Sequence, residues 1–143
     1  MIKNLTLLIY IPIGAALGVL LNLLISATPL PDIFPYYNEN AAPAFYSIQA
    51  WAAVLLFMVA APVLEELLFR VFLFNLLRQK LGLMTASVLS SILFGIYHGN
   101  AVQMAYAFCM GMAFSLLYDH DHRIPVPIIL HASANAAVYF LLR

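Results

Sequence analysis

Charged residues are scarce in this chain. Asp, Glu, Lys and Arg make up 8% of its 143 residues, whereas a typical soluble domain contains about 25%. Hydrophobic residues make up 65%, against a typical value of about 45–50%. The formal net charge is zero and no basic run occurs, so the electrostatic features of a nucleic-acid-binding protein are missing. The composition therefore predicts an integral membrane protein, and the length predicts one domain, residues 1–143.

Cysteine is almost absent as well. Cys109 is the one cysteine of the chain and lies in an apolar segment, so no disulfide can form within the chain. We interpret Cys109 as a buried, inert thiol, which does not indicate a cellular compartment.

Apolar residues form long segments separated by short polar stretches, at 5–27, 44–77, 84–98, 101–118 and 125–142. A helix needs about 20 such residues to cross the ~30 Å hydrocarbon core of a bilayer. The sequence thus predicts an all-α polytopic membrane bundle of about five transmembrane helices. The second segment would measure ~51 Å as one helix. Pro62 predicts a kink within it, because proline donates no backbone hydrogen bond.

The first apolar segment is open to two interpretations. A signal peptide cleaved near Ala27 is one alternative, but the apolar run is longer than the about 7–15 residues usual in such peptides. We therefore expect an extra, retained N-terminal transmembrane helix over residues 5–27. Gly14 and Gly18 are four residues apart, a spacing that lets another membrane helix approach closely.

Positive charges predict how the chain is oriented in the membrane. The positive residues expected on one side are Lys3, Arg78, Lys80 and Arg123. The loops expected on the other side, residues 28–43 and 99–100, contain no Lys or Arg, and only Arg143 disagrees. Because cytoplasmic loops are enriched in Lys and Arg, we expect a multi-pass protein of the plasma (inner) membrane with a cytoplasmic N-terminus.

A few ionisable side chains lie inside the apolar segments. They are Glu65, Glu66, Arg70, His98 and His131. Each would be costly in contact with lipid, so such residues face the protein interior or a wet cavity and are candidates for function by default. The alternative is a structural ion-pair network that holds a small bundle together.

The spacing of these side chains indicates how they divide the chemistry. Glu66 and Arg70 are four residues apart with Glu first, the order that favours an ion pair on one helix face. Glu65 lies about 100° around the helix, so it can face another partner or water and act as a general base. His131 and Asn135 are also four apart, and an imidazole and a carboxamide on one face can donate hydrogen bonds to an oxyanion.

Depth in the membrane fits less well. Counted from the cytoplasmic helix ends at ~1.5 Å per residue, Glu65 and His98 lie ~20 Å deep but His131 only ~9 Å deep. The three side chains are compatible with one cavity only after the helices tilt.

Three short motifs occur in order, one in each of three apolar segments. Residues 65–70 fit EExxxR, residues 94–98 fit FxxxH and residues 131–135 fit HxxxN. In this order they resemble the CPBP family, which comprises CAAX prenyl endopeptidases, bacteriocin-processing proteins and abortive-infection proteins. The resemblance extends over residues 59–142, which would form the protease core.

The resemblance implies a glutamic-type intramembrane endopeptidase. The residues to which it assigns catalytic roles are Glu65, His98, His131 and Asn135, and the supporting residues are Glu66 and Arg70. Glu65 would activate the hydrolytic water, which His98 would help to hold, and His131 with Asn135 would stabilise the oxyanion. The resemblance favours chemistry without a cofactor, although a glutamate and two histidines are also plausible zinc ligands.

The expected partners are the lipid bilayer and a membrane protein or peptide substrate, with no nucleic acid. Larger members of the family have more helices than this chain. We therefore expect either a small hydrophobic substrate, rather than a prenylated CAAX protein, or self-association into a homo-oligomer.

Two other functions compete with the peptidase. A catalytically silent scaffold or bacteriocin-immunity protein would use the same buried polar groups to keep its shape and recognise a partner. A small proton or ion carrier is less well supported, because the ionisable groups cluster without forming a path to either face. We interpret the alternating Asp and His residues at 119–122 as a solvated turn rather than a site for a divalent cation.

Overall fold

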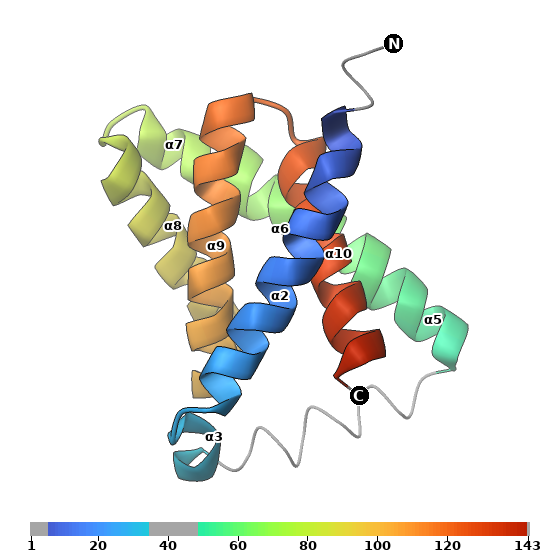
Figure 1. Ribbon diagram of the computed structural model, residues 1–143. Helices are drawn as coiled ribbons and strands as arrows, with labels where there is room; N and C mark the ends of the chain where they lie inside the picture. The colour runs from blue at the N-terminus through green and yellow to red at the C-terminus, as the bar shows by residue number, and fades with distance from the viewer. Residues whose placement is uncertain (1–5, 35–48, 143) are drawn as a thin grey trace.

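The computed structural model describes residues 6–34 and 49–142 (Figure 1). All regular secondary structure in these residues is helical, which confirms the predicted all-α fold class. In chain order the elements are η1 (Thr6–Ile9), α2 (Tyr10–Ser26), α3 (Leu30–Ile33), α5 (Ala50–Leu55), η2 (Leu56–Ala60), α6 (Ala61–Glu66), η3 (Leu67–Phe74), α7 (Asn75–Arg78), α8 (Leu83–Tyr97), α9 (Ala101–Asp121) and α10 (Pro125–Leu141).

Helix ends follow local sequence signals. Asn100 caps the start of α9, because its side-chain oxygen accepts a backbone N–H of the first turn at 2.8 Å. Pro125 lies in the first turn of α10, where a missing N–H is tolerated. α9 ends where His122 adopts a left-handed conformation with φ 58°, so this helix extends past the predicted end at residue 118. One helical turn, α3, lies in the stretch predicted as a loop, of which residues 35–43 are outside the described residues.

The second predicted segment is one continuous helix from α5 to α7, residues 50–78. It does not keep one hydrogen-bonding pattern, since η2 and η3 are π-helical. Directly before Pro62, the amide of Ala61 donates to the carbonyl of Leu56, five residues earlier. The irregularity predicted at Pro62 is therefore a π-helical turn beside it, and the helix continues through. Such turns inside α-helices are frequent at functional sites.

The other helices pack in two close pairs. α2 packs along α10, α8 packs along α9, and α9 contacts α10. The long helix crosses these pairs obliquely and lies behind them in Figure 1. Its η2 and α6 portions contact α10, whereas η3 contacts α8 and α9. This crossing places α6, which carries both glutamates, against the helix that carries His131.

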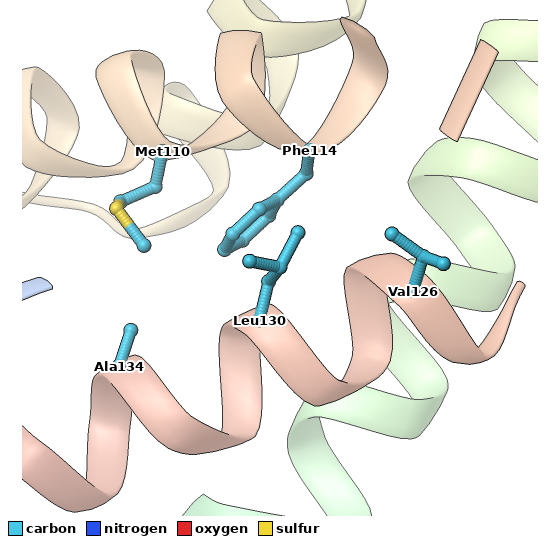
Figure 2. Close-up of a cluster of buried hydrophobic side chains, with 5 residues drawn as sticks. All are labelled: Met110, Phe114, Val126, Leu130 and Ala134. Carbon is cyan, nitrogen blue, oxygen red and sulfur yellow. The ribbon is translucent and has the colours of Figure 1, made fainter. Parts of the chain in front are cut away.

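A hydrophobic core lies between α9 and α10 (Figure 2). Its buried members are Met110, Phe114, Val126, Leu130 and Ala134. Leu17 and Leu21 of α2 pack against this cluster from outside. A second buried cluster of Phe69, Phe94 and Ala107 joins η3, α8 and α9. The site described below lies between these two clusters, because Phe94 and Phe114 both contact its residues.

Close approach between α2 and α10 depends on two glycines. A Cβ atom built at Gly14 would lie 2.4 Å from the carbonyl oxygen of Leu130, and one at Gly18 would lie 2.9 Å from the Cα of Ala134. Real Cβ atoms do not come this near to backbone atoms, so neither position has space for a side chain. The predicted small-residue contact is confirmed, and its partner is α10.

Replacing Gly14 with alanine is expected to destabilise the bundle by about 1–3 kcal/mol, the usual effect of overpacking. The added methyl group must push α2 away from α10. The Ser133 hydroxyl at 2.2 Å can rotate aside, but the backbone O and Cα of Leu130 at 2.4 and 2.7 Å cannot. Denaturant-induced unfolding in detergent micelles measures the loss. Gly82→Ala is the matched control, because nothing lies within 4 Å of a Cβ at Gly82. Equal stability of the two variants would contradict the close α2–α10 contact.

The distribution of side chains is that of a membrane protein. Large apolar side chains cover the outside, and Trp51, Leu64 and Phe72 are each more than 60% exposed. The buried polar side chains, in contrast, are Glu66, Arg70, Ser87, Ser90, Ser91, Ser115 and His131. Two helices, Thr6–Ser26 and Ala101–Asp121, are long and apolar enough to cross a membrane by length and composition, and α8 and α10 are shorter apolar helices. These features agree with the predicted membrane bundle.

The prediction for Cys109 was wrong. This side chain is exposed on α9, not buried. An apolar segment predicts burial in a soluble protein, but lipid tails are as apolar as a protein core, so an apolar membrane helix also has an outward face.

Polar contacts gather charged residues at one end of the bundle. Arg78 pairs with Asp119 at 3.0 Å, and Asp121 accepts hydrogen bonds from Tyr10 at 3.0 Å and from Arg123 at 2.9 Å. These contacts hold the turn after α7, the turn after α9 and the start of α2 at the same end, as Figure 1 shows.

Arg78 and Arg123 therefore lie at the same end of the bundle, and the membrane topology predicted from them stays a prediction. Lys3 and Arg143 lie outside the described residues. Which end faces the cytoplasm stays a prediction.

Candidate active site

An ion pair between Glu66 and Arg70 forms the buried base of the site. Glu66 ends α6 and Arg70 lies one turn later in η3. Their Oε2 and Nε atoms are 3.0 Å apart, and both side chains are 0% exposed. The four-residue spacing predicted this pair. Each charge offsets the other in a dry interior, where a lone charge would be strongly unfavourable.

His131 of α10 lies between the two glutamates. Its Nδ1 is 2.9 Å from Oε1 of Glu66, which accepts a hydrogen bond from this nitrogen. Its Nε2 is 3.8 Å from Oε2 of Glu65, too far for a direct hydrogen bond. Because the Glu66 carboxylate is paired with Arg70 and accepts this hydrogen bond, it orients His131 with Nδ1–H toward Glu66 and Nε2 toward Glu65.

Glu65 differs from Glu66 in its surroundings. Its side chain is 15% exposed, and its Oε2 accepts no hydrogen bond from any described residue, although this oxygen is itself buried. A buried carboxylate oxygen with spare acceptor capacity calls for an explanation. It is suited to accept a proton from a water molecule bound beside it.

Arg70 is held by more than its ion pair. Its guanidinium lies 4.6 Å from the ring centroid of Phe94 and 5.3 Å from that of Phe114, and Nη2 is 3.4 Å from the carbonyl oxygen of Gly111. Aromatic faces attract a cation at this range. Phe94 belongs to the FxxxH motif, but Phe114 and Gly111 lie in α9, where no sequence motif singled them out.

His98 approaches the site through an aromatic neighbour. Its Nδ1 is 2.8 Å from the carbonyl oxygen of Phe94 one turn earlier, so Nδ1 donates and Nε2 remains for another partner. The Phe94 ring contacts the rings of both His98 and His131, with centroids 4.8 Å and 5.8 Å away. One phenylalanine thus connects the two histidines.

Asn135 makes a contact that the sequence did not predict. Its Nδ2 donates a hydrogen bond of 2.9 Å to the carbonyl oxygen of Phe57 in η2. The bond joins α10 to the π-helical turn that precedes Pro62. One amide hydrogen of Asn135 is thereby used, and the other remains available for a ligand.

The helix tilt that the depth estimates require is present. Glu66 and His131 are in direct contact despite their unequal distances from their helix ends. The long helix crosses the bundle obliquely (Figure 1), so distance along it overstates depth. The site therefore combines residues from α6, η3, α8 and α10.

Acidic and histidine side chains are the candidate metal ligands of this chain. Within residues 6–34 and 49–142, no three His, Cys, Asp or Glu side chains are arranged to hold one metal ion. At 119–122 the carboxylates of Asp119 and Asp121 pair with Arg78 and Arg123.

Comparison with known proteins matches the region that carries the site. The family model for Rce1-like type II CAAX prenyl endopeptidases matches residues 47–137. The chain is 32% identical over 105 residues to “Putative membrane peptidase YdiL” of Bacillus subtilis (strain 168), covering 73% of this chain and 43% of that protein. It is 35% identical over 86 residues to “Membrane-embedded CAAX protease MroQ” of Staphylococcus aureus (strain USA300), covering 56% and 35%.

These relatives are longer proteins. The chain spans less than half the length of each of the two. No solved structure is significantly similar to it. The matched region contains α6, α8 and the site residues of α10, whereas α2 lies before it.

Proposed function

Because the chain belongs to the Rce1-like family of type II CAAX prenyl endopeptidases, we propose that it is an intramembrane endopeptidase that uses water activated by Glu65. The observation that carries the proposal is the line of contacts from Arg70 through Glu66 and His131 to Glu65. One carboxylate is fixed in an ion pair, and the other keeps a buried oxygen with no donor among the described residues. Two carboxylates in such different surroundings suit two roles, an orienting group and a base.

The proposed reaction is hydrolysis of a peptide bond. Glu65 takes a proton from water as the water oxygen bonds to the carbonyl carbon. The carbonyl oxygen becomes an oxyanion. It accepts hydrogen bonds from the second amide hydrogen of Asn135 and from Nε2–H of His131, which enters the reaction as an imidazolium with its Nδ1–H bound to Glu66. Glu65 then gives its proton to the amine nitrogen as the C–N bond breaks.

The remaining residues orient these groups. Glu66 binds Nδ1–H of His131 and stabilises the ring when Nε2 is also protonated. Arg70 pairs with Glu66 and holds its carboxylate in place. His98 would hold the water from the other side with its free Nε2, because its Nδ1 is bound to Phe94. We propose that no metal takes part.

The substrate we propose is a hydrophobic segment of a membrane or exported protein. Exposed apolar side chains surround the long helix, with Leu64 and Leu68 67% and 49% exposed on either side of the two glutamates. A hydrophobic segment can reach Glu65 through the lipid phase along such a surface. We further propose a plasma (inner) membrane location with the charged end of the bundle in the cytoplasm.

A cleavage assay tests the proposal. Purified protein in liposomes is mixed with quenched hydrophobic peptides, among them one with a farnesylated CAAX end, with and without a chelator. We expect cleavage of unprenylated hydrophobic peptides at the same rate with chelator. A rate that falls on chelation and returns with added zinc would place a metal in the site. Preference for the farnesylated peptide would overturn the substrate proposal.

A scaffold or immunity protein remains the rival function. It would use the same Glu66–Arg70–His131 contacts to keep its shape. If no peptide is cut, a cellular phenotype that persists in Glu65→Gln would favour this rival, because a scaffold has no need of a base.

A further inference from the structure

Five buried residues of the long helix lie at every fourth position, and we call them the buried stripe: Met58, Pro62, Glu66, Arg70 and Phe74. Phe69, next to Arg70, is also buried but lies outside this series. An α-helix has about 3.6 residues per turn, so a residue four positions later lies about 40° further around the helix axis. Over the four steps from Met58 to Phe74 this shift adds up to ~160°. In an unbroken α-helix, either the start or the end of this stripe would therefore face lipid.

The π-helical turns explain why the stripe stays inside. A π-helical turn contains more residues than an α-helical turn. Alternation of η2, α6 and η3 therefore gives an average turn close to four residues over this part of the chain. Glu66 and Arg70 lie at the centre of the stripe, so their direction depends on both π-helical segments.

Neighbouring helices hold a carbonyl group in each π-helical segment. Asn135 donates to Phe57 in η2, and the hydroxyl of Ser90 in α8 donates to the carbonyl oxygen of Phe69 in η3 at 3.0 Å. Ser90 is 0% exposed and belongs to none of the three motifs. A buried hydrogen bond of this kind fixes one helix against another more strongly than an exposed one.

Ser90 is also close in sequence and space to the aromatic residues of the site. It precedes Phe94 by one turn of α8, and the Phe69 and Phe94 rings meet edge to face with centroids 4.9 Å apart. Phe94 in turn lies over Arg70 and against His131. A shift of η3 relative to α8 would move Arg70 and Glu66 away from these contacts.

We propose that Ser90 is a positioning residue, whose hydroxyl holds the π-helical segment after Glu66 and so aims the Glu66–Arg70 pair at His131. The kinetic part of this inference rests on the proposed peptidase function. Ser90→Ala is expected to lower kcat by about tenfold to a hundredfold, with KM changed less than about twofold, because a small misplacement of catalytic groups has effects of this size. Ser90→Cys, which keeps a weak donor of similar size, should recover part of the rate.

The chain offers a matched control. Ser87 is on the same helix and is also 0% exposed, but its hydroxyl makes no hydrogen bond to any described residue. Ser87→Ala removes the same atoms without breaking a bond, so it should leave kcat unchanged. Equal kinetics for Ser90→Ala and Ser87→Ala would overturn the proposal.

A second measurement does not need turnover. The Nδ1–H of His131, hydrogen-bonded to Glu66, should give a downfield proton resonance in NMR spectra of histidine-labelled protein, assigned by its shift in Glu66→Gln. We expect it to shift or broaden in Ser90→Ala and to stay in place in Ser87→Ala. If the wild type cleaves no peptide, the proposed function fails, but this resonance still decides the role of Ser90. An unchanged resonance in Ser90→Ala would refute it.

Discussion

Glu65→Gln is expected to abolish peptide cleavage, with kcat reduced by about 10²–10⁴-fold, the range typical of a lost general base. Glutamine has the same shape as glutamate and keeps an acceptor oxygen, but it cannot take a proton from water. The structure gives Glu65 no other task that would be lost, since its contact with His131 is 3.8 Å long and its Oε2 accepts no hydrogen bond from a described residue. The fold should therefore survive the substitution.

Kinetics, circular dichroism and denaturant unfolding together separate an effect on the reaction from an effect on the fold. The values of kcat and KM in liposomes, with and without chelator, report the reaction. Circular dichroism and denaturant unfolding report the fold. The control is Asp119→Asn, which neutralises a carboxylate in the partly exposed pair with Arg78 and should leave kcat unchanged. Full activity of Glu65→Gln would rule out Glu65 as the base. Loss of both activity and helical structure would instead assign Glu65 to the structural network.

Most of the fold could be predicted from the sequence because backbone polar groups in lipid must be hydrogen-bonded within the protein. The apolar segments therefore had to be helices, and the described helices agree with the predicted segments apart from their ends. The ion pair was readable too, since residues four apart on a helix are neighbours whatever surrounds them. Gly14 and Gly18 predicted a close helix contact for the same local reason.

The contacts between different helices could not be predicted from spacing along the sequence. Phe114 and Gly111 meet Arg70, and Phe57 meets Asn135, only because of the angle at which the long helix crosses the bundle. No spacing along one helix determines that angle. The depth estimates depended on the same angle, because they assumed untilted helices.

The π-helical segments correspond to a sequence pattern, a series of residues at intervals of four, that was not used in the prediction. Pro62, Glu66 and Arg70 are four residues apart, and the same interval extended in both directions reaches Met58 and Phe74. Over such a length a strict interval of four disagrees with an α-helix. The four-residue interval is a weak signal because Met58 and Phe74 are apolar residues in an apolar segment, where many residues four positions apart are apolar. Only the burial of these side chains in the structure distinguishes this series from the others.

Arg70→Met is expected to produce the largest loss of stability, about 3–5 kcal/mol, the usual effect of removing one partner of a buried ion pair. Methionine fills much of the space but leaves Glu66 fully buried with only His131 as a partner. It also removes the cation from between Phe94 and Phe114. Denaturant unfolding in detergent micelles measures the loss.

Two further variants show whether the effect comes from a buried charge. Arg78→Met removes an arginine whose ion pair with Asp119 is partly exposed, 40% and 21%, so it should lose no more than about 1 kcal/mol. The double variant Glu66→Gln with Arg70→Met should be more stable than Arg70→Met alone, because no unpaired carboxylate remains at position 66 and glutamine still accepts Nδ1–H of His131. If the double variant is no more stable than Arg70→Met, the loss is one of packing against Phe94 and Phe114. If Arg70→Met lowers the free energy of unfolding no more than Arg78→Met, the Glu66–Arg70 pair is not enclosed in a dry interior. Glu66 would then not hold His131 in a fixed orientation beside Glu65.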